Sequence, residues 1–441
     1  MNSRLLCAFL FLLHVATFAQ KSTLPEALPF GINLCGGEFS ENRLPGILGQ
    51  DYAYPTIQDI DYFYNRGFRL FDILFKWERI QKSLGGPLES QDLQQIKSLV
   101  AYCESKGIQV ILSLHNFGRY NLRGVDYIVG TQQVSRAHFK DVWNKLTQEF
   151  KGFKNIYAYD IMHEPHNMGS YSWRETAQQA IDEIRKQDKH TAIMIAGNNY
   201  AACEKWEEFS DDLRFLHDPS NKIIYDAHSY FDEDYSGRYK KPYHLAEVDE
   251  MIGIQRVLPF VKWLKKHNKR GFIGEYGVPD YDVRWLKVLE NFMNCLQDLG
   301  VNGNYWAGGP LWKNYPLSVQ PENGKPDRPQ MKIIQAHLST PYSRFPNIHY
   351  ADLKKIQEHF VKHQPRPPSY LAFLHPPKKA KESKLSQTNT ANKNNSPKDK
   401  SNQVKAQPAA LPSNNNKSNS LLPGQSLIPV AGGISLLPPR E

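Results

Sequence analysis

The chain has 441 residues, of which 40% are hydrophobic and 22% are charged. This is an ordinary globular composition, and the length is sufficient for one large core or two domains. The formal net charge is +9, but residues 376–441 hold ten Lys or Arg against three acidic residues and therefore carry +7 of it. The remainder is nearly neutral and gives no electrostatic reason to expect a nucleic-acid partner.

The first residues have the pattern of a secretory signal. Arg4 precedes an apolar run from Leu5 to Leu13, and Thr17-Phe18-Ala19-Gln20 follows, with cleavage expected near Ala19. We predict a signal peptide over residues 1–19, because the run is too short to span a bilayer. No later stretch is long and apolar enough to cross a membrane. We therefore expect a secreted protein, extracellular or periplasmic, without an integral membrane segment.

Four cysteines remain after the predicted cleavage, namely Cys35, Cys103, Cys203 and Cys295. None lies in a CxxC or a Cys/His ligand spacing, so we expect no zinc site. Disulfide pairing stays open for an exported protein, but burial as small apolar side chains is favoured.

Strand-like and helix-like segments alternate along the chain. The expected strands are residues 29–34, 68–73, 109–114, 156–162, 192–197, 222–228, 271–274 and 303–306. The expected helices are residues 57–65, 90–106, 135–150, 173–186, 251–266 and 285–299. Such alternation predicts a parallel sheet, and eight units fit a closed (β/α)8 TIM barrel of class α/β. A doubly wound open sheet is the alternative. It is disfavoured because no Gly-rich phosphate loop follows the first strand.

The barrel is expected to occupy residues 25–340 as the catalytic domain. Residues 341–375 would form a C-terminal extension that could be helical. Residues 376–441 are rich in Lys, Asn, Ser and Pro with few aromatics, so we expect a disordered tail.

Polar residues follow many of the expected strands, where barrel active sites lie. Taken singly, each has an ordinary structural interpretation as a hydrogen-bonded histidine, a capping glutamate or a core tryptophan. Their coincidence on one face of one barrel indicates a sugar-binding acid/base site. These residues are His115, Asn116, Glu164, His228, Tyr230, Glu275 and Trp306.

Seven segments in this order resemble glycoside hydrolase family 5, in particular its bacterial and fungal endoglucanase-like branch. They start at Gly31, Trp77, Leu114, Met162, Asp226, Gly274 and Tyr305, and include Met162-His163-Glu164-Pro165-His166 and Gly274-Glu275-Tyr276-Gly277. The resemblance spans about residues 29 to 338.

The resemblance implies a role for each residue of the site. Glu164 would be the acid/base and Glu275 the nucleophile of a retaining glycosidase. Tyr230 would hydrogen-bond the nucleophile, and His228 would orient the acid/base region. His115 and Asn116 would contact sugar hydroxyls, and Trp306 would form the platform under the sugar. Trp312 and Trp206 are candidates for outer platforms or, equally, for the core.

Two residues depart from the family pattern. His163 replaces the Asn that normally precedes the acid/base, and Asp72 replaces an Arg five residues before Trp77. In the family this Arg supports the nucleophile and the Asn binds the 2-hydroxyl of the scissile sugar. We hypothesise that Asp72 and His163 form a hydrogen-bonded pair that replaces them, and we count both as substrate-binding candidates.

We therefore predict a secreted, retaining endo-type β-glycosidase acting on a β-glucan or related polysaccharide. The alternatives are a β-glycosidase of altered sugar or linkage specificity and a non-hydrolytic glycan-binding barrel. No cofactor or metal is expected, since side chains supply both acid and nucleophile. The expected partner is a polysaccharide or oligosaccharide substrate and not a nucleic acid, and we expect a monomer.

Overall fold

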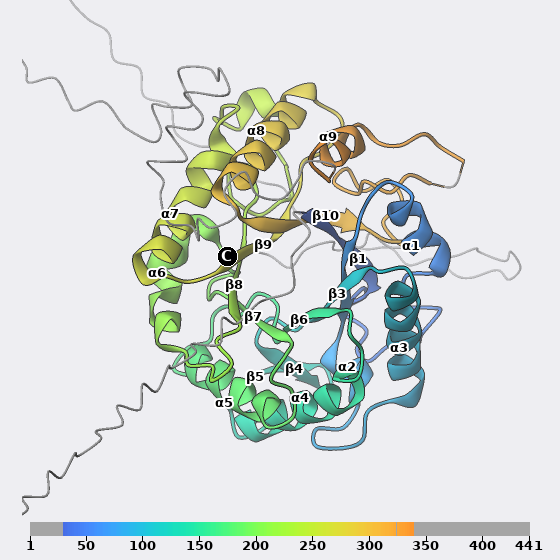
Figure 1. The fold of residues 1–441 in the computed structure, drawn as a ribbon, viewed down its shortest axis with the longest axis vertical. Helices are drawn as coiled ribbons and strands as arrows, with labels where there is room; N and C mark the ends of the chain where they lie inside the picture. Colours follow the sequence, from blue (N-terminus) through green and yellow to red (C-terminus); the bar gives the residue numbers. More distant parts are fainter. Residues whose placement is uncertain (1–29, 323, 339–441) are drawn as a thin grey trace, which may run out of the picture. The chain divides into compact units, whose positions relative to one another are not determined.

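The structure, a computed structural model, describes residues 30–322 and 324–338 (Figure 1). In this part of the chain eight parallel strands close into a barrel in the order β1-β10-β9-β8-β7-β6-β3-β2. The barrel strands are β1 (Phe30–Gly37), β2 (Leu70–Phe75), β3 (Gln109–Leu114), β6 (Ile156–Asp160), β7 (Ala192–Ala196), β8 (Ile223–His228), β9 (Gly271–Tyr276) and β10 (Asn302–Gly308). The predicted (β/α)8 barrel is confirmed, and the open sheet is excluded because the sheet closes on itself.

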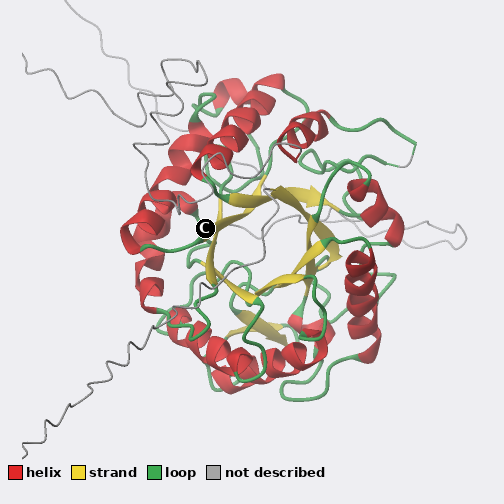
Figure 2. Cartoon of the chain, viewed as in Figure 1, coloured by secondary structure: helices red, strands yellow, loops and turns green. Residues whose placement is uncertain are grey.

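Helices surround the strands on the outside of the barrel (Figure 2). The α-helices are α1 (Ile57–Tyr64), α2 (Trp77–Ile80), α3 (Ser90–Ser105), α4 (Arg136–Phe150), α5 (Trp173–Arg185), α6 (Trp206–Ser210), α7 (Ile252–His267), α8 (Val283–Leu299) and α9 (Pro329–Leu338). Short 3-10 turns lie at Cys203–Lys205, Asp211–Phe215 and Tyr243–Leu245. All six predicted helices are present, whereas α2, α6 and α9 were not predicted.

Sequence features explain why these helices form where they do. In α3 the buried residues Ile96, Leu99, Val100 and Cys103 recur at the helical spacing and give the helix one apolar face. Helix α4 begins at a capping box, in which the Ser135 side chain accepts from the His138 amide and the His138 ring accepts from the Ser135 amide. The apolar face therefore explains how α3 packs, and the capping box explains where α4 begins.

The lower part of the barrel is filled by apolar side chains from the first residues of the strands. Leu70, Ala192 and Phe272 belong to one buried cluster contributed by six strands. Further along the same strands the interior becomes polar, with Asp72, Asp160 and other carboxyl groups. The apolar base supports a polar upper end, which is where the site lies.

One supersecondary element was not predicted. Strands β4 (Arg119–Leu122) and β5 (Val125–Ile128) form an antiparallel hairpin after β3. Its two turn residues, Arg123 and Gly124, both have positive φ, as a tight two-residue hairpin requires.

The four cysteines of the described residues are buried, as favoured from the sequence, and none of them forms a disulfide with another described cysteine. None of the helices between residues 30 and 338 combines the length and the apolar character needed to cross a membrane. The predicted signal peptide, the C-terminal extension from residue 341 and the tail lie outside the described residues.

Candidate active site

The two predicted glutamates meet at the upper end of the barrel. Glu164 follows strand β6, and Glu275 is the fifth residue of β9. A register shift between β8 and β9 after Ala227 places His228 directly opposite Glu275. One ligand-type atom from each of His163, Glu164, His228 and Glu275 lies within 4.8 Å of all the others. The carboxylates therefore approach closely enough to act on one bond.

A hydrogen-bond network holds the carboxylates in place. The Tyr230 hydroxyl donates to Glu275 Oε2 at 2.7 Å. His228 Nδ1 lies 2.6 Å from Glu164 Oε1 and 3.7 Å from Glu275 Oε2. Tyr230 and His228 therefore contact the two glutamates, and the roles that the resemblance implied for them stay predictions.

The groups around His228 favour its protonated form. Burial alone would lower its pKa, but the negative charge of Glu275 and hydrogen bonds to Asp226 and Glu164 outweigh burial and raise the pKa well above its usual value. Its Nε2 lies 3.3 Å from Asp226 Oδ2. As an imidazolium, His228 donates from both ring nitrogens and joins the two carboxylates electrostatically.

The backbone of Glu164 is strained. Its φ is +43°, in the left-handed region that residues with side chains rarely adopt. Pro165 follows it, and a residue before proline is already restricted. Strain of this kind costs about 1–3 kcal/mol and is typical of functional sites, where the surroundings impose it.

His163 is stacked between aromatic neighbours and directed at both glutamates. Its ring lies 3.5 Å from that of His115, nearly parallel. Its Nε2 is 3.4 Å from Glu275 Oε1 and 3.8 Å from Glu164 Oε2. Burial, and then the charges of Lys76 and His228, hold the pKa of His115 well below its usual value. The low pKa of His115 favours its neutral form, so His163 stacks against an uncharged ring.

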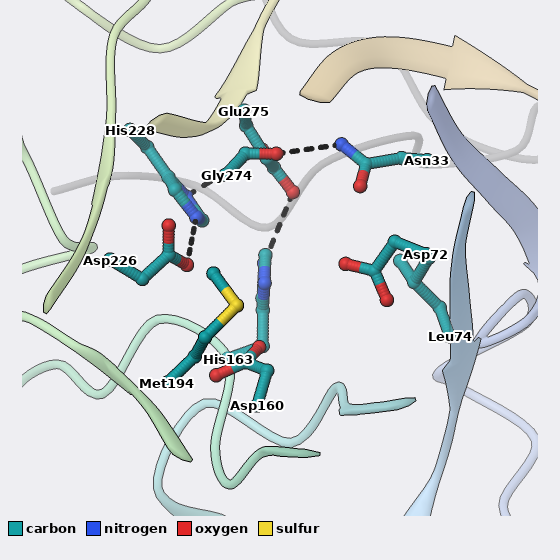
Figure 3. Close-up of a pocket in the computed structure, with 10 residues that line it drawn as sticks. All are labelled: Asn33, Asp72, Leu74, Asp160, His163, Met194, Asp226, His228, Gly274 and Glu275. Atoms are coloured by element: carbon teal, nitrogen blue, oxygen red, sulfur yellow. Dashed lines mark hydrogen bonds and ion pairs between the residues drawn. The ribbon is translucent and has the colours of Figure 1, made fainter. Parts of the chain in front are cut away.

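The hypothesised hydrogen-bonded pair of Asp72 and His163 is wrong. Asp72 Oδ1 is buried without a hydrogen-bonding partner, and the ion pairs of His163 are made with the glutamates instead (Figure 3). Burial, and then the charges of Asp160, Asp226 and Glu275, raise the pKa of Asp72 well above its usual value. A protonated Asp72 adds no negative charge beside the nucleophile, so no pairing with His163 is needed to offset one.

A small cavity of about 10 Å³, the space of about one water molecule, lies beneath the carboxylates. Its polar lining includes Asn33, Asp160 and Asp226, none of which was singled out from the sequence (Figure 3). Asn33 donates to the Gly274 carbonyl at 2.8 Å, and burial raises the pKa of Asp160 to about 7. Asp226 could have been found, because residues two apart in a strand face the same side as His228.

The remaining candidates lie in different surroundings. The Asn116 side-chain carbonyl accepts from the Trp77 amide at 2.7 Å and its NH2 group donates to Glu78 at 2.8 Å, so Asn116 ties the segment after β3 to the start of α2. Its predicted sugar contact stays a prediction. Trp306 lies beside His115, with ring centroids 6.1 Å apart.

The two other tryptophans are now distinguished. Trp206 is fully buried against Phe260 and Trp263 and is a core residue. Trp312 packs edge-on against Trp306 at 5.6 Å, behind the predicted platform.

The closed barrel and the converging carboxylates define the class of protein, a (β/α)8 enzyme of the glycosidase type. The chain matches the sequence model of the family Cellulase (glycosyl hydrolase family 5) over residues 29–311. It belongs to glycoside hydrolase family 5, and the resemblance inferred from the sequence is confirmed.

Individual relatives agree with this assignment. The chain is 30% identical over 313 residues to endo-beta-1,4-glucanase B of Emericella nidulans, covering 70% of this chain and 91% of that protein. It is 30% identical over 300 residues to endoglucanase 3 of Humicola insolens, covering 67% and 74%. Among solved structures, Pseudomonas stutzeri endoglucanase Cel5A in complex with cellobiose is 38% identical, with a TM-score of 0.67 and coverage of 71% and 93%.

Proposed function

We propose that this protein is a secreted, retaining endo-β-1,4-glucanase-like glycosidase. The observation that carries the proposal is the approach of Glu164 and Glu275, whose nearest ligand oxygens lie within 4.8 Å of each other. Retaining glycosidases hold their carboxyl groups about 5–5.5 Å apart, whereas inverting enzymes need about 6.5–9.5 Å to admit a water molecule. The spacing favours double displacement.

In the first step Glu275 attacks the anomeric carbon while Glu164 protonates the leaving oxygen, which breaks the glycosidic bond. In the second step Glu164 deprotonates a water molecule, which attacks the anomeric carbon and releases Glu275. The proton shared between His228 Nδ1 and Glu164 Oε1 across 2.6 Å is available for the first donation. The Tyr230 hydroxyl keeps Glu275 oriented and ionised by donating to it.

A change in sugar preference is the second candidate function, because of His163. In the resembled family an Asn at this position contacts the 2-hydroxyl, a contact that strengthens in the transition state. In this chain the His163 imidazole, 3.4 Å from Glu275 Oε1, takes the place of that Asn. A β-linked polysaccharide other than cellulose would then be the better substrate.

Trapping with a 2-deoxy-2-fluoro glycoside, followed by peptide mapping, tests the mechanism. We expect the label on Glu275 and none on Glu275→Gln. A label elsewhere, or inversion of product stereochemistry, would refute the assignment. Reducing-end release from a panel of β-glucans, mannans and xylans separates the two candidate specificities. Retardation by a glucan gel without release, unchanged in Glu164→Gln, would instead indicate a non-hydrolytic glycan-binding protein.

A further inference from the structure

Four buried side chains around the scissile position form a set that fits a metal ion. They are His163, Glu164, His228 and Glu275, each at most 5% exposed. Each glutamate turns one oxygen toward each imidazole. Glu164 faces His163 with Oε2 and His228 with Oε1, whereas Glu275 faces them with Oε1 and Oε2 respectively.

One ligand atom from each side chain lies within 4.8 Å of the other three, so the four must move closer together to form a coordination tetrahedron. Zinc–nitrogen and zinc–oxygen bonds of about 2.0–2.1 Å place neighbouring tetrahedral ligands about 3.3–3.4 Å apart. The imidazole–carboxylate contacts use both oxygens of each glutamate, and three of these four distances are 3.4, 3.7 and 3.8 Å. The fourth, between His228 and Glu164, is 2.6 Å and must open by less than about 1 Å.

The donor types select the ion. Two imidazole nitrogens with two carboxylate oxygens suit Zn²⁺ and its first-row neighbours, whereas Ca²⁺ and Mg²⁺ require oxygen ligands. His163 completes the set, because the Asn that the family normally has there offers no imidazole. The departure that removes a sugar contact therefore supplies the second nitrogen ligand.

The surroundings of the two imidazoles provide independent support. His228 Nε2 lies 3.3 Å from Asp226 Oδ2, the carboxylate–histidine contact that orients histidine ligands in metal sites. The His163 ring is fixed by stacking on His115 at 3.5 Å and by the edge of Phe117 at 5.3 Å. Both rings are thus held before an ion arrives, which reduces the cost of ordering them. Binding of the ion at His228 Nδ1 releases the proton that this nitrogen carries in the metal-free site.

We propose that these four residues form an inhibitory binding site for a divalent ion of the zinc type. An ion bound there coordinates Glu275 and Glu164 together, so that neither nucleophile nor acid can reach the sugar. The inhibition rests on the proposed function, whereas the binding does not. No ligand spacing in the sequence could reveal this site, because its ligands lie in or directly after three different strands, β6, β8 and β9.

Calorimetric titration of the full chain with zinc chloride tests the site without any activity measurement. We expect one zinc equivalent, and a dissociation constant at least about tenfold weaker in His163→Asn, since losing even an outer-shell partner costs 10–100-fold. Glu275→Gln should weaken binding similarly without changing the shape of the site. The matched control His217→Asn removes an exposed imidazole far from the set and should bind as the wild type does.

Cobalt substitution gives a second readout, since four-coordinate Co²⁺ absorbs strongly in the visible and octahedral Co²⁺ does not. Zinc should also stop hydrolysis reversibly, with recovery on adding EDTA. Zinc affinity equal in wild type and both ligand variants would overturn the proposal. Ligand-dependent zinc binding by a chain that hydrolyses no glycan would support the site and refute the glycosidase, whereas active enzyme that binds no zinc would refute the site alone.

Discussion

Glu38 makes the folded protein sensitive to alkaline pH. It directly follows β1 and is 5% exposed, with Oε2 accepting from the Gly36 amide at 2.7 Å. Oε1 is buried without a hydrogen-bonding partner. Burial is the largest influence and raises the pKa of Glu38 from 4.5 to about 7, although the Gly36 amide and Lys76 partly oppose it. The folded state therefore binds this proton more tightly than the unfolded state.

The sign and size of the effect follow from linkage. A raised folded-state pKa contributes stability that is present below the unfolded value and is lost as pH rises through about 7. The rise in the pKa of Glu38 from 4.5 to about 7 corresponds to about 3 kcal/mol of unfolding free energy in full. About 2–3 kcal/mol of this stabilisation is lost between pH 5 and pH 8.5. Glu38→Gln keeps the shape and removes the charge, so this part of the pH dependence should vanish.

Urea unfolding followed by tryptophan fluorescence at pH 5, 7 and 8.5 measures this difference. Between pH 5 and pH 8.5 the free energy of unfolding should fall by about 2–3 kcal/mol more in the wild type than in Glu38→Gln. Glu208→Gln changes an exposed glutamate and should follow the wild type. Parallel curves for wild type and Glu38→Gln would show that burial does not keep Glu38 protonated.

Three further variants examine other contacts. Tyr230→Phe removes a hydrogen bond to a charged group, worth about 1.5–3 kcal/mol. The acidic limb of the pH profile of kcat/KM, measured with EDTA, should therefore move up by about 1–2 pH units. An unmoved limb would contradict the role of Tyr230 as a hydrogen-bond donor to an ionised Glu275. Asp72→Asn should leave that profile in place and change the unfolding free energy by less than about 1 kcal/mol at pH 6, because Asp72 is already protonated; a clear shift would mean that it is ionised. Arg185→Met breaks a buried bidentate pair with Asp218, at 2.7 and 2.9 Å, and should cost about 3–5 kcal/mol in guanidinium unfolding; a loss below 1 kcal/mol would show that the pair is dispensable.

The barrel could be predicted because each strand is a short apolar run and each helix has its own stripe. The glutamates could be predicted for the same reason, since a carboxylate that ends such a run must lie at the strand's carboxyl end. The β4–β5 hairpin was missed because its strands are only half-buried and lack an apolar run. Trp206 could not be assigned, because a core indole and a sugar platform look alike until packing is known.

Distances across the barrel could not be predicted in the same way. The contact between His228 and Glu164 joins residues 64 positions apart, and a register shift between β8 and β9 places His228 opposite Glu275. The protonation of Asp72 depends on Asp160 and Asp226, which lie on other strands. A sequence shows that a charge has changed but not which charges surround it, so the predicted pairing with His163 was wrong.

The two departures from the family pattern therefore act separately. A protonated Asp72 adds no negative charge beside Glu275, so this replacement removes the positive charge of the Arg without adding repulsion. His163 instead faces both glutamates and lies where a sugar hydroxyl would otherwise find an amide. Because the same imidazole completes the proposed zinc set, substrate preference and metal sensitivity should change together in His163→Asn and neither should change in Asp72→Asn. A variant that changed substrate preference without changing metal sensitivity, or the reverse, would show that the two properties do not both depend on His163.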